Sequence, residues 1–137
     1  MRVALATGVA CLALATPACA ASTDNPRTTV QRYFAALGRG DAAGACRQLT
    51  PGSQEKLKEF ADRVLRLKRP SCEGAIGALL RSPNGAALRR LAHARITRID
   101  VHGKRAEVRV ARVNAPIDLA RTAHGWRIDS EPSGEND

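Results

Sequence analysis

The chain has 137 residues, a formal net charge of +9 at pH 7, and an aromatic content of only one tryptophan, one tyrosine and two phenylalanines. This length allows one domain with a single hydrophobic core. The positive charge favours anionic partners, but the arginines are scattered and the aromatic side chains that stack on bases are almost absent, so we expect no nucleic-acid partner.

Residues 1–20 have the composition of a secretory signal peptide. Arg2 supplies the positive start, an apolar stretch runs from Val3 to Ala15, and Ala18-Cys19-Ala20 supplies a cleavage site before Ala21. The apolar stretch is shorter than the roughly 18 residues that a membrane-spanning helix needs, and no other segment approaches that length. We therefore expect a secreted or extracytoplasmic protein of the bacterial cell envelope, with no transmembrane segment.

Cys19 leaves a second mode of export open. A lipoprotein is acylated on a cysteine that follows small and aliphatic residues, and Thr16 and Pro17 fit that pattern poorly. Free secretion is therefore favoured over a lipid anchor on Cys19. Residues 21–25 are expected to form a linker to a single domain at 26–130.

Helical periodicity extends over the first two thirds of this domain. Four predicted helices begin at capping residues or at an early proline: Asn25-Pro26, Asp41, Thr50-Pro51 and Ser71. Gly38 and Gly40 are expected to end the first helix. Breaks at 68–70 and 82–85 end the third and the fourth, and a short helical piece follows. Apolar residues recur at helical spacing, so these faces are expected to be buried: Val30, Tyr33, Phe34 and Leu37; Ala42, Ala45, Cys46 and Leu49; Leu57, Phe60, Ala61, Val64 and Leu65; Cys72, Ile76, Leu79 and Leu80.

From residue 94 the period of the apolar pattern changes to two, which is typical of strands. Four stretches alternate in this way, at 94–101 (with a one-residue slip), 106–110, 117–119 and 126–128. Turn sequences at 102–104 and 124–125 separate them in part. Helices followed by an antiparallel meander predict an α+β domain in which the helices cover one face of the sheet. The polar tail at 131–137 is expected to be disordered.

Two cysteines, Cys46 and Cys72, remain after the predicted signal peptide. In an oxidising compartment they are most simply a disulfide, and the alternatives are buried free thiols or a reactive Cys46. Nothing near Cys46 in the sequence supplies a base that would activate a thiolate. His93, His102 and His124 do not have the spacing of zinc ligands. We therefore expect one disulfide, no metal site and no cofactor.

The stretch TVQRYFAALGRGD at 29–41 and the final strand GWRI at 125–128 resemble the nuclear-transport-factor-2-like superfamily. This superfamily includes ketosteroid isomerase and the SnoaL-like polyketide cyclases. The resemblance covers most of residues 26–130. It implies a cone, in which N-terminal helices pack on a strongly curved antiparallel sheet of three to four strands and a pocket lies at the open end.

Two stretches are similar to ketosteroid isomerase in particular. In that family the tyrosine of the first helix, here Tyr33, and a protonated aspartic acid on a later strand, here Asp118 in APIDLARTAHGW, form the oxyanion hole. The sequence departs from the family at the general base, because 51–67 reads as a helix without a matching aspartate and Glu55 and Glu59 belong to its charged face. Proton transfer requires a base. A core tyrosine at 33 and a solvated or arginine-paired Asp118 therefore stay open as alternatives.

Arg112 and Arg121 continue the alternation of the apolar sets at 108–110 and 117–119 toward the side that the helices cover. In a pocket they would favour an anionic ligand. The alternative is that both snorkel to the edge of the sheet. The predicted pocket is lined by Tyr33, Phe34, Arg112, Asp118, Arg121 and Trp126.

Three functions follow from these patterns. The first is a non-catalytic exported domain that binds a small ligand or an envelope partner in the cone-shaped pocket. The second is a SnoaL-like isomerase or cyclase that acts on a small hydrophobic molecule through Tyr33 and Asp118. The third is the binding of anionic envelope polymers through an arginine-rich surface that includes Arg105 and Arg109. The oligomeric state stays open, with a dimer as one alternative.

Overall fold

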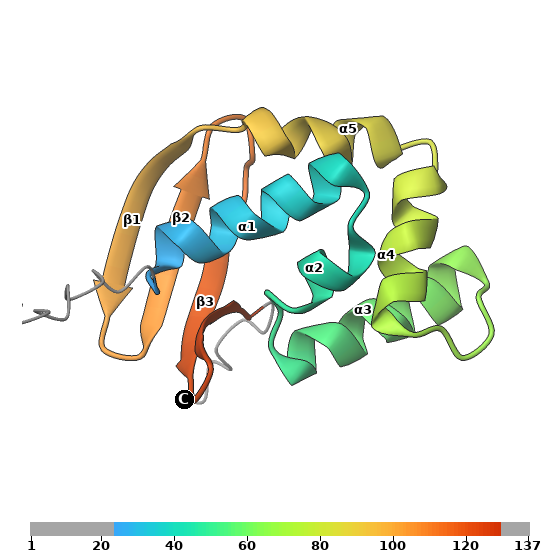
Figure 1. The fold of residues 1–137 in the computed structure, drawn as a ribbon, viewed down its shortest axis with the longest axis horizontal. Helices are drawn as coiled ribbons and strands as arrows, with labels where there is room; N and C mark the ends of the chain where they lie inside the picture. The colour runs from blue at the N-terminus through green and yellow to red at the C-terminus, as the bar shows by residue number, and fades with distance from the viewer. Residues whose placement is uncertain (1–23, 130–137) are drawn as a thin grey trace, which may run out of the picture.

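The computed structural model describes residues 24–129 (Figure 1). The predicted signal peptide with Cys19, most of the predicted linker and the polar tail lie outside the described residues. The helices are α1 (Pro26–Arg39), α2 (Ala42–Cys46), α3 (Pro51–Leu65), α4 (Cys72–Arg81) and α5 (Gly85–Arg90), followed by a 3-10 turn, η1 (Leu91–His93). The strands are β1 (Ile96–His102), β2 (Arg105–Val110), β3 (Ile117–Thr122) and β4 (Gly125–Ile128). The α+β class is therefore confirmed.

The four predicted capping residues stand at the starts of α1 to α4. Asn25 accepts a hydrogen bond from the backbone N–H of Thr28 at 2.9 Å, and Asp41, Thr50 and Ser71 cap α2, α3 and α4 in the same way. The first helix continues through Gly38, and Gly40 ends it with a left-handed φ of 70°. The prediction that Gly38 stops this helix was wrong.

The sheet is antiparallel throughout, with strand order β1-β2-β3-β4. Ile99 pairs with Val108, and a register shift between Ile96 and Arg98 confirms the one-residue slip. Residues that pair across strands share a face, and the faces alternate along each strand. The inner face, which α1 crosses in Figure 1, carries Ile99, Ala106, Val108, Val110, Leu119, Trp126 and Ile128. The outer face carries Arg98, Asp100, Glu107, Arg109, Asp118 and Arg127, and none of these six side chains is buried.

The sheet is neither closed nor strongly curled, so the cone shape is not confirmed. Side chains fill the space between α1 and the inner face, where Val30, Val108 and Leu119 are fully buried. At the β4 edge, the backbone N–H of Thr50 donates to the carbonyl of Ile128 at 2.9 Å, and the N–H of Ile128 donates to the carbonyl of Gln48 at 2.7 Å. The chain between α2 and α3 therefore covers this edge.

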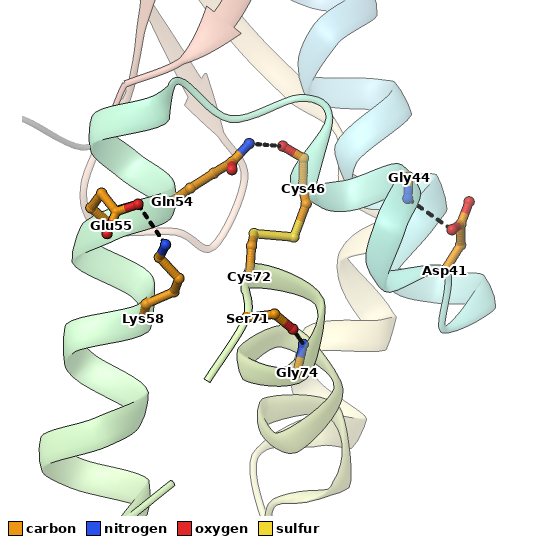
Figure 2. Close-up of a disulfide and its surroundings, with 9 residues drawn as sticks. All are labelled: Asp41, Gly44, Cys46, Gln54, Glu55, Lys58, Ser71, Cys72 and Gly74. Atoms are coloured by element: carbon orange, nitrogen blue, oxygen red, sulfur yellow. Dashed lines mark hydrogen bonds and ion pairs between the residues drawn. A yellow bond between two sulfur atoms is a disulfide. The ribbon is translucent and has the colours of Figure 1, made fainter. Parts of the chain in front are cut away.

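A disulfide joins Cys46, the last residue of α2, to Cys72, the first residue of α4 (Figure 2). Both residues are buried, and their Cα atoms are 6.1 Å apart. The side chain of Gln54 on α3 donates a hydrogen bond to the carbonyl of Cys46 at 2.9 Å. Three helices therefore meet at the predicted disulfide, which is confirmed.

The apolar stripe predicted for the third helix is only partly buried. Ala61 is fully buried, whereas Phe60 and Val64 are 41% and 58% exposed. Residues 51–65 pack chiefly against α4, so one side of the helix is covered and the side with Phe60 and Val64 is not. Among the described residues, no helix has both the length and the apolar character needed to cross a membrane.

Candidate functional site

The pocket predicted between the first helix and the sheet is occupied by core side chains. Phe34 on α1 and Trp126 on β4 are each 4% exposed and belong to the same hydrophobic cluster as Leu37 and Val108. A hydrogen bond also holds the backbone of Trp126, because its carbonyl accepts from the side-chain hydroxyl of Thr29 at 3.1 Å. Phe34 and Trp126 are therefore core residues, and their assignment to a pocket lining was wrong.

Tyr33 lies at the margin of this core. It is half-buried on α1 and borders a small hollow of about 290 Å³ with Leu49, Ser53, Lys56, Leu57 and Ile128. Burial raises the pKa of the Tyr33 phenol above its ordinary value of 10.0, so the side chain is a neutral donor at physiological pH. The other residues around this hollow include no carboxylate or histidine that could act as a base.

Asp118 lies on the other side of the sheet from Tyr33. Its cross-strand partner is Glu107, and Leu119, the next residue, is the one that faces the core. Desolvation and the nearby Glu107 carboxylate raise the pKa of Asp118, and Arg105 opposes this effect. The register places Asp118 on the outer face, and Tyr33 lies on the helix that covers the inner face, so the structure does not bring the phenol and the carboxyl together. This arrangement agrees with the alternative of a half-buried Tyr33 and a carboxyl at the solvated face.

Asp118→Asn is expected to raise the free energy of unfolding at pH 7 slightly, by up to about 0.5 kcal/mol, because it removes a like charge directly opposite Glu107. A raised pKa means that the folded protein favours the protonated carboxyl of Asp118. The free energy of unfolding of the native protein therefore falls as the pH rises above the ordinary pKa of 3.8. The gain should therefore vanish below that pH. Urea melts at pH 7 and pH 3 measure it, and a clear loss of stability at pH 7 would contradict this placement.

Three arginines on the outer side of the sheet form ion pairs with neighbouring carboxylates. Arg98 contacts Asp100 at 2.7 Å, and Arg109 contacts Glu107 at 2.9 Å. Arg105 forms a 2.7 Å ion pair with Asp129, which also accepts a hydrogen bond from the hydroxyl of Thr50. Alternating charge of this kind is typical of a solvated sheet face. Arg105 and Arg109, which the sequence placed on a polyanion-binding surface, therefore have acidic partners.

A different set of basic side chains lines a cleft beside α5 and η1, to which the end of α1, the segment before β1 and the β2–β3 turn contribute. The cleft consists of two adjoining hollows of about 760 and 520 Å³, which share Arg90 and His93. The larger hollow also has Arg95 and Arg112, and the smaller one has Arg39 and Arg89. No aspartate or glutamate lines either hollow. We call these two hollows the basic cleft.

The larger hollow combines charge with an apolar floor. Its apolar lining consists of Ala87, Leu91, Ala94, Ala111 and Val113. Within residues 24–129, no carboxylate forms an ion pair with Arg90, Arg95 or Arg112. Uncompensated guanidinium groups beside an apolar surface attract anions more strongly than paired ones, because no internal carboxylate has to be displaced.

Local backbone structure brings the arginines of the larger hollow together. The N–H of Ala111 donates to the carbonyl of Arg95 at 2.9 Å, which places the β2–β3 turn beside the segment that leads into β1. Arg112 has a left-handed φ of 66°, which is uncommon for a large side chain and occurs where the surrounding structure imposes it. Arg112 thus lines the cleft from the turn and not from a strand.

The sequence did not predict the basic cleft. Arg112 was expected in a pocket between the first helix and the sheet, whereas in the structure it lines the larger hollow of the cleft. Arg121 pairs with Trp126 across β3 and β4, as its parity indicates, but it is exposed and lines none of the hollows described above. The signal that could have indicated the cleft is a cluster of four basic residues within positions 89–95: Arg89, Arg90, His93 and Arg95.

Gly38 allows η1 to approach α1 and so helps to position the basic cleft. A Cβ at residue 38 would lie 2.6 Å from the Cβ of Ala92, which real structures do not tolerate without a shift. Gly38→Ala is therefore expected to lower the free energy of unfolding by about 1–3 kcal/mol, the usual cost of overpacking.

Gly52→Ala is the matched control, because nothing lies within 4 Å of a Cβ at that helical position. This variant should be neutral or stabilising by up to about 1 kcal/mol. Denaturant melts compare the two variants. Equal stability of Gly38→Ala and Gly52→Ala would contradict the close approach of η1 to α1.

Comparison of the chain with family models, with curated proteins and with solved structures gives no match. Membership of the nuclear-transport-factor-2-like superfamily is therefore a proposal, and a fold by itself does not define a function.

Proposed function

We propose that this protein is a non-catalytic ligand-binding domain of the extracytoplasmic space, and that its ligand is anionic and binds in the basic cleft. The observation that carries the proposal is the lining of the larger hollow, which contains Arg90, Arg95 and Arg112 and no acidic residue. The volume of that hollow, about 760 Å³, is within the roughly 300–1,000 Å³ of small-molecule sites.

The extracytoplasmic location is supported by two independent features. The first is the signal-peptide pattern at 1–20. The second is the disulfide between Cys46 and Cys72, because such bonds persist in oxidising compartments and are rare in reducing ones. Kinship with the nuclear-transport-factor-2-like superfamily belongs to the same proposal and is supported by the order of helices and antiparallel strands.

The two alternative functions have less support. An isomerase or cyclase needs Tyr33 and Asp118 on the same side of the sheet, and the register separates them. Binding of an envelope polymer across Arg105 and Arg109 would have to compete with the carboxylates of Asp129 and Glu107. The basic cleft carries the stronger case because its larger hollow has charge without such competition.

The experiment compares two double variants that remove the same charge. Arg95→Ala/Arg112→Ala removes two cleft arginines, whereas Arg98→Ala/Arg109→Ala removes two paired arginines of the outer face. Affinity for inorganic pyrophosphate is measured by titration at low salt, since screening weakens exposed charge contacts. We expect the affinity of the cleft variant to fall at least about tenfold, because one or two charge-assisted hydrogen bonds are lost. The affinity of the control should fall less than about twofold. Equal losses would overturn the proposal.

A further inference from the structure

We infer that the ligand of the basic cleft is a single-chain amphiphilic anion, with a carboxylate or phosphate head on the arginines and an apolar chain on the floor of the larger hollow. This inference rests on the proposed function and narrows it from anions in general to one chemical class. The larger hollow has both arginines and apolar side chains in its lining, and an amphiphilic anion has a group for each.

The floor of the larger hollow is apolar and fixed in place. Leu91, Ala94 and Val113 are half-buried and pack against the hydrophobic core on their other side. A small inorganic anion held by the arginines would leave this floor in contact with water. An alkyl chain laid on the floor would remove apolar area from water, which is favourable in proportion to the area covered.

The guanidinium groups are suited to one compact anionic head. Arg95 and Arg112 come from two segments that the 2.9 Å backbone bond between Ala111 and Arg95 holds side by side, and Arg90 comes from the end of α5. Guanidinium groups bind the paired oxygens of a carboxylate or a phosphate through two parallel hydrogen bonds. His93 adds a further polar group to the same lining.

The chain-length dependence of affinity distinguishes an amphiphile from a simple anion. Full burial of one methylene group changes affinity about fourfold. The larger hollow is partly open to solvent, so we expect a bound alkyl chain to be half-covered and each methylene group to change affinity about twofold. Decanoate should therefore bind about 16-fold more tightly than hexanoate, since the two differ by four methylene groups.

The experiment is a calorimetric titration of the full chain with its disulfide formed, below the micelle concentration of each probe. The probes are hexanoate, decanoate, decyl phosphate, decanol and inorganic phosphate. We expect decanoate and decyl phosphate to bind at least about tenfold more tightly than decanol, which lacks the charge, and than phosphate, which lacks the chain. Arg95→Ala/Arg112→Ala should remove this advantage over decanol.

A variant of the lining gives a second readout in which the arginines themselves are unchanged. Ala87 and Ala86 are both exposed on α5, but only Ala87 lines the larger hollow. Ala87→Glu places a carboxylate at the cleft and should weaken decanoate binding at least about tenfold, whereas Ala86→Glu carries the same charge and should change it less than about threefold. Because both side chains are exposed, neither change is expected to affect folding.

Three results would overturn the inference. If decanoate and inorganic phosphate bind equally and both depend on Arg95 and Arg112, the amphiphile inference fails and the proposed function stands. If no probe depends on these arginines, both fail. If vesicles of anionic phospholipid bind in an arginine-dependent way and decanoate does not, the site recognises a membrane surface and not a single-chain ligand.

Discussion

Removal of the Cys46–Cys72 disulfide is expected to lower the free energy of unfolding by about 3–4 kcal/mol, because the bond closes a long loop in the unfolded chain. The two residues are 26 positions apart and link α2, which has five residues, to α4, which has ten. Helices of this length are marginal on their own. The bond therefore holds together a part of the fold that local structure alone would not stabilise.

The measurement is thermal and urea unfolding of Cys46→Ala/Cys72→Ala, in which no free thiol can form wrong pairs. For a domain near 100 residues, this loss corresponds to a fall in Tm of roughly 10–25 °C. The native protein in a reducing agent is the control and should behave like the double variant. A change in Tm of only a few degrees in both samples would show that the disulfide contributes little to the fold.

Trp126→Ala is expected to lower the free energy of unfolding by about 3–5 kcal/mol, the usual cost of removing a large buried aromatic side chain. Trp126 is 4% exposed and packs in the cluster that joins α1 to the sheet. A pocket-lining tryptophan would face solvent or ligand, and its truncation would cost much less. The stability of this variant therefore distinguishes a core residue from a pocket residue at the same position.

Arg121→Ala is the matched control, because Arg121 is the cross-strand partner of Trp126 and is exposed. Its free energy of unfolding should stay within about 0.5 kcal/mol of the native value. Urea melts at pH 7 compare the two variants. Similar small changes in both would contradict a filled core between α1 and the inner face of the sheet.

Features that depend on neighbouring residues could be predicted from the sequence. Capping hydrogen bonds extend over three residues, so Asn25, Asp41, Thr50 and Ser71 indicate helix starts without any knowledge of the tertiary structure. Period-two alternation similarly predicted the four strands, including the slip near the start of β1. The disulfide followed from the presence of two cysteines in a chain with a signal-peptide pattern.

Features that depend on how distant elements pack could not be predicted in this way. The apolar spacing of Phe60 and Val64 predicted burial, but it carries no information on how far α3 extends beyond the elements that cover it. Arg112 kept the parity of β2 in the sequence, yet the strand ends at Val110 and a left-handed turn redirects the chain. The basic cleft joins two segments whose adjacency only the sheet register establishes.

For Asp118, strand periodicity and the family resemblance pointed to different positions, and the solvated alternative stayed open beside the oxyanion-hole one. Ile117 and Leu119 alternate as inward residues, so strand periodicity by itself places Asp118 on the opposite face. The resemblance to the oxyanion-hole strand suggested a pocket position. Local alternation was the better guide here because it follows from backbone geometry.

The most direct test of the basic cleft is an NMR titration of the full chain with decanoate, in which the backbone amides report where the ligand binds. We expect the largest shift changes at residues 87–95 and 111–113, which contain the lining of the larger hollow. Changes centred on Tyr33 and the small hollow beside it, or on the outer face of the sheet, would contradict the assignment of the binding site.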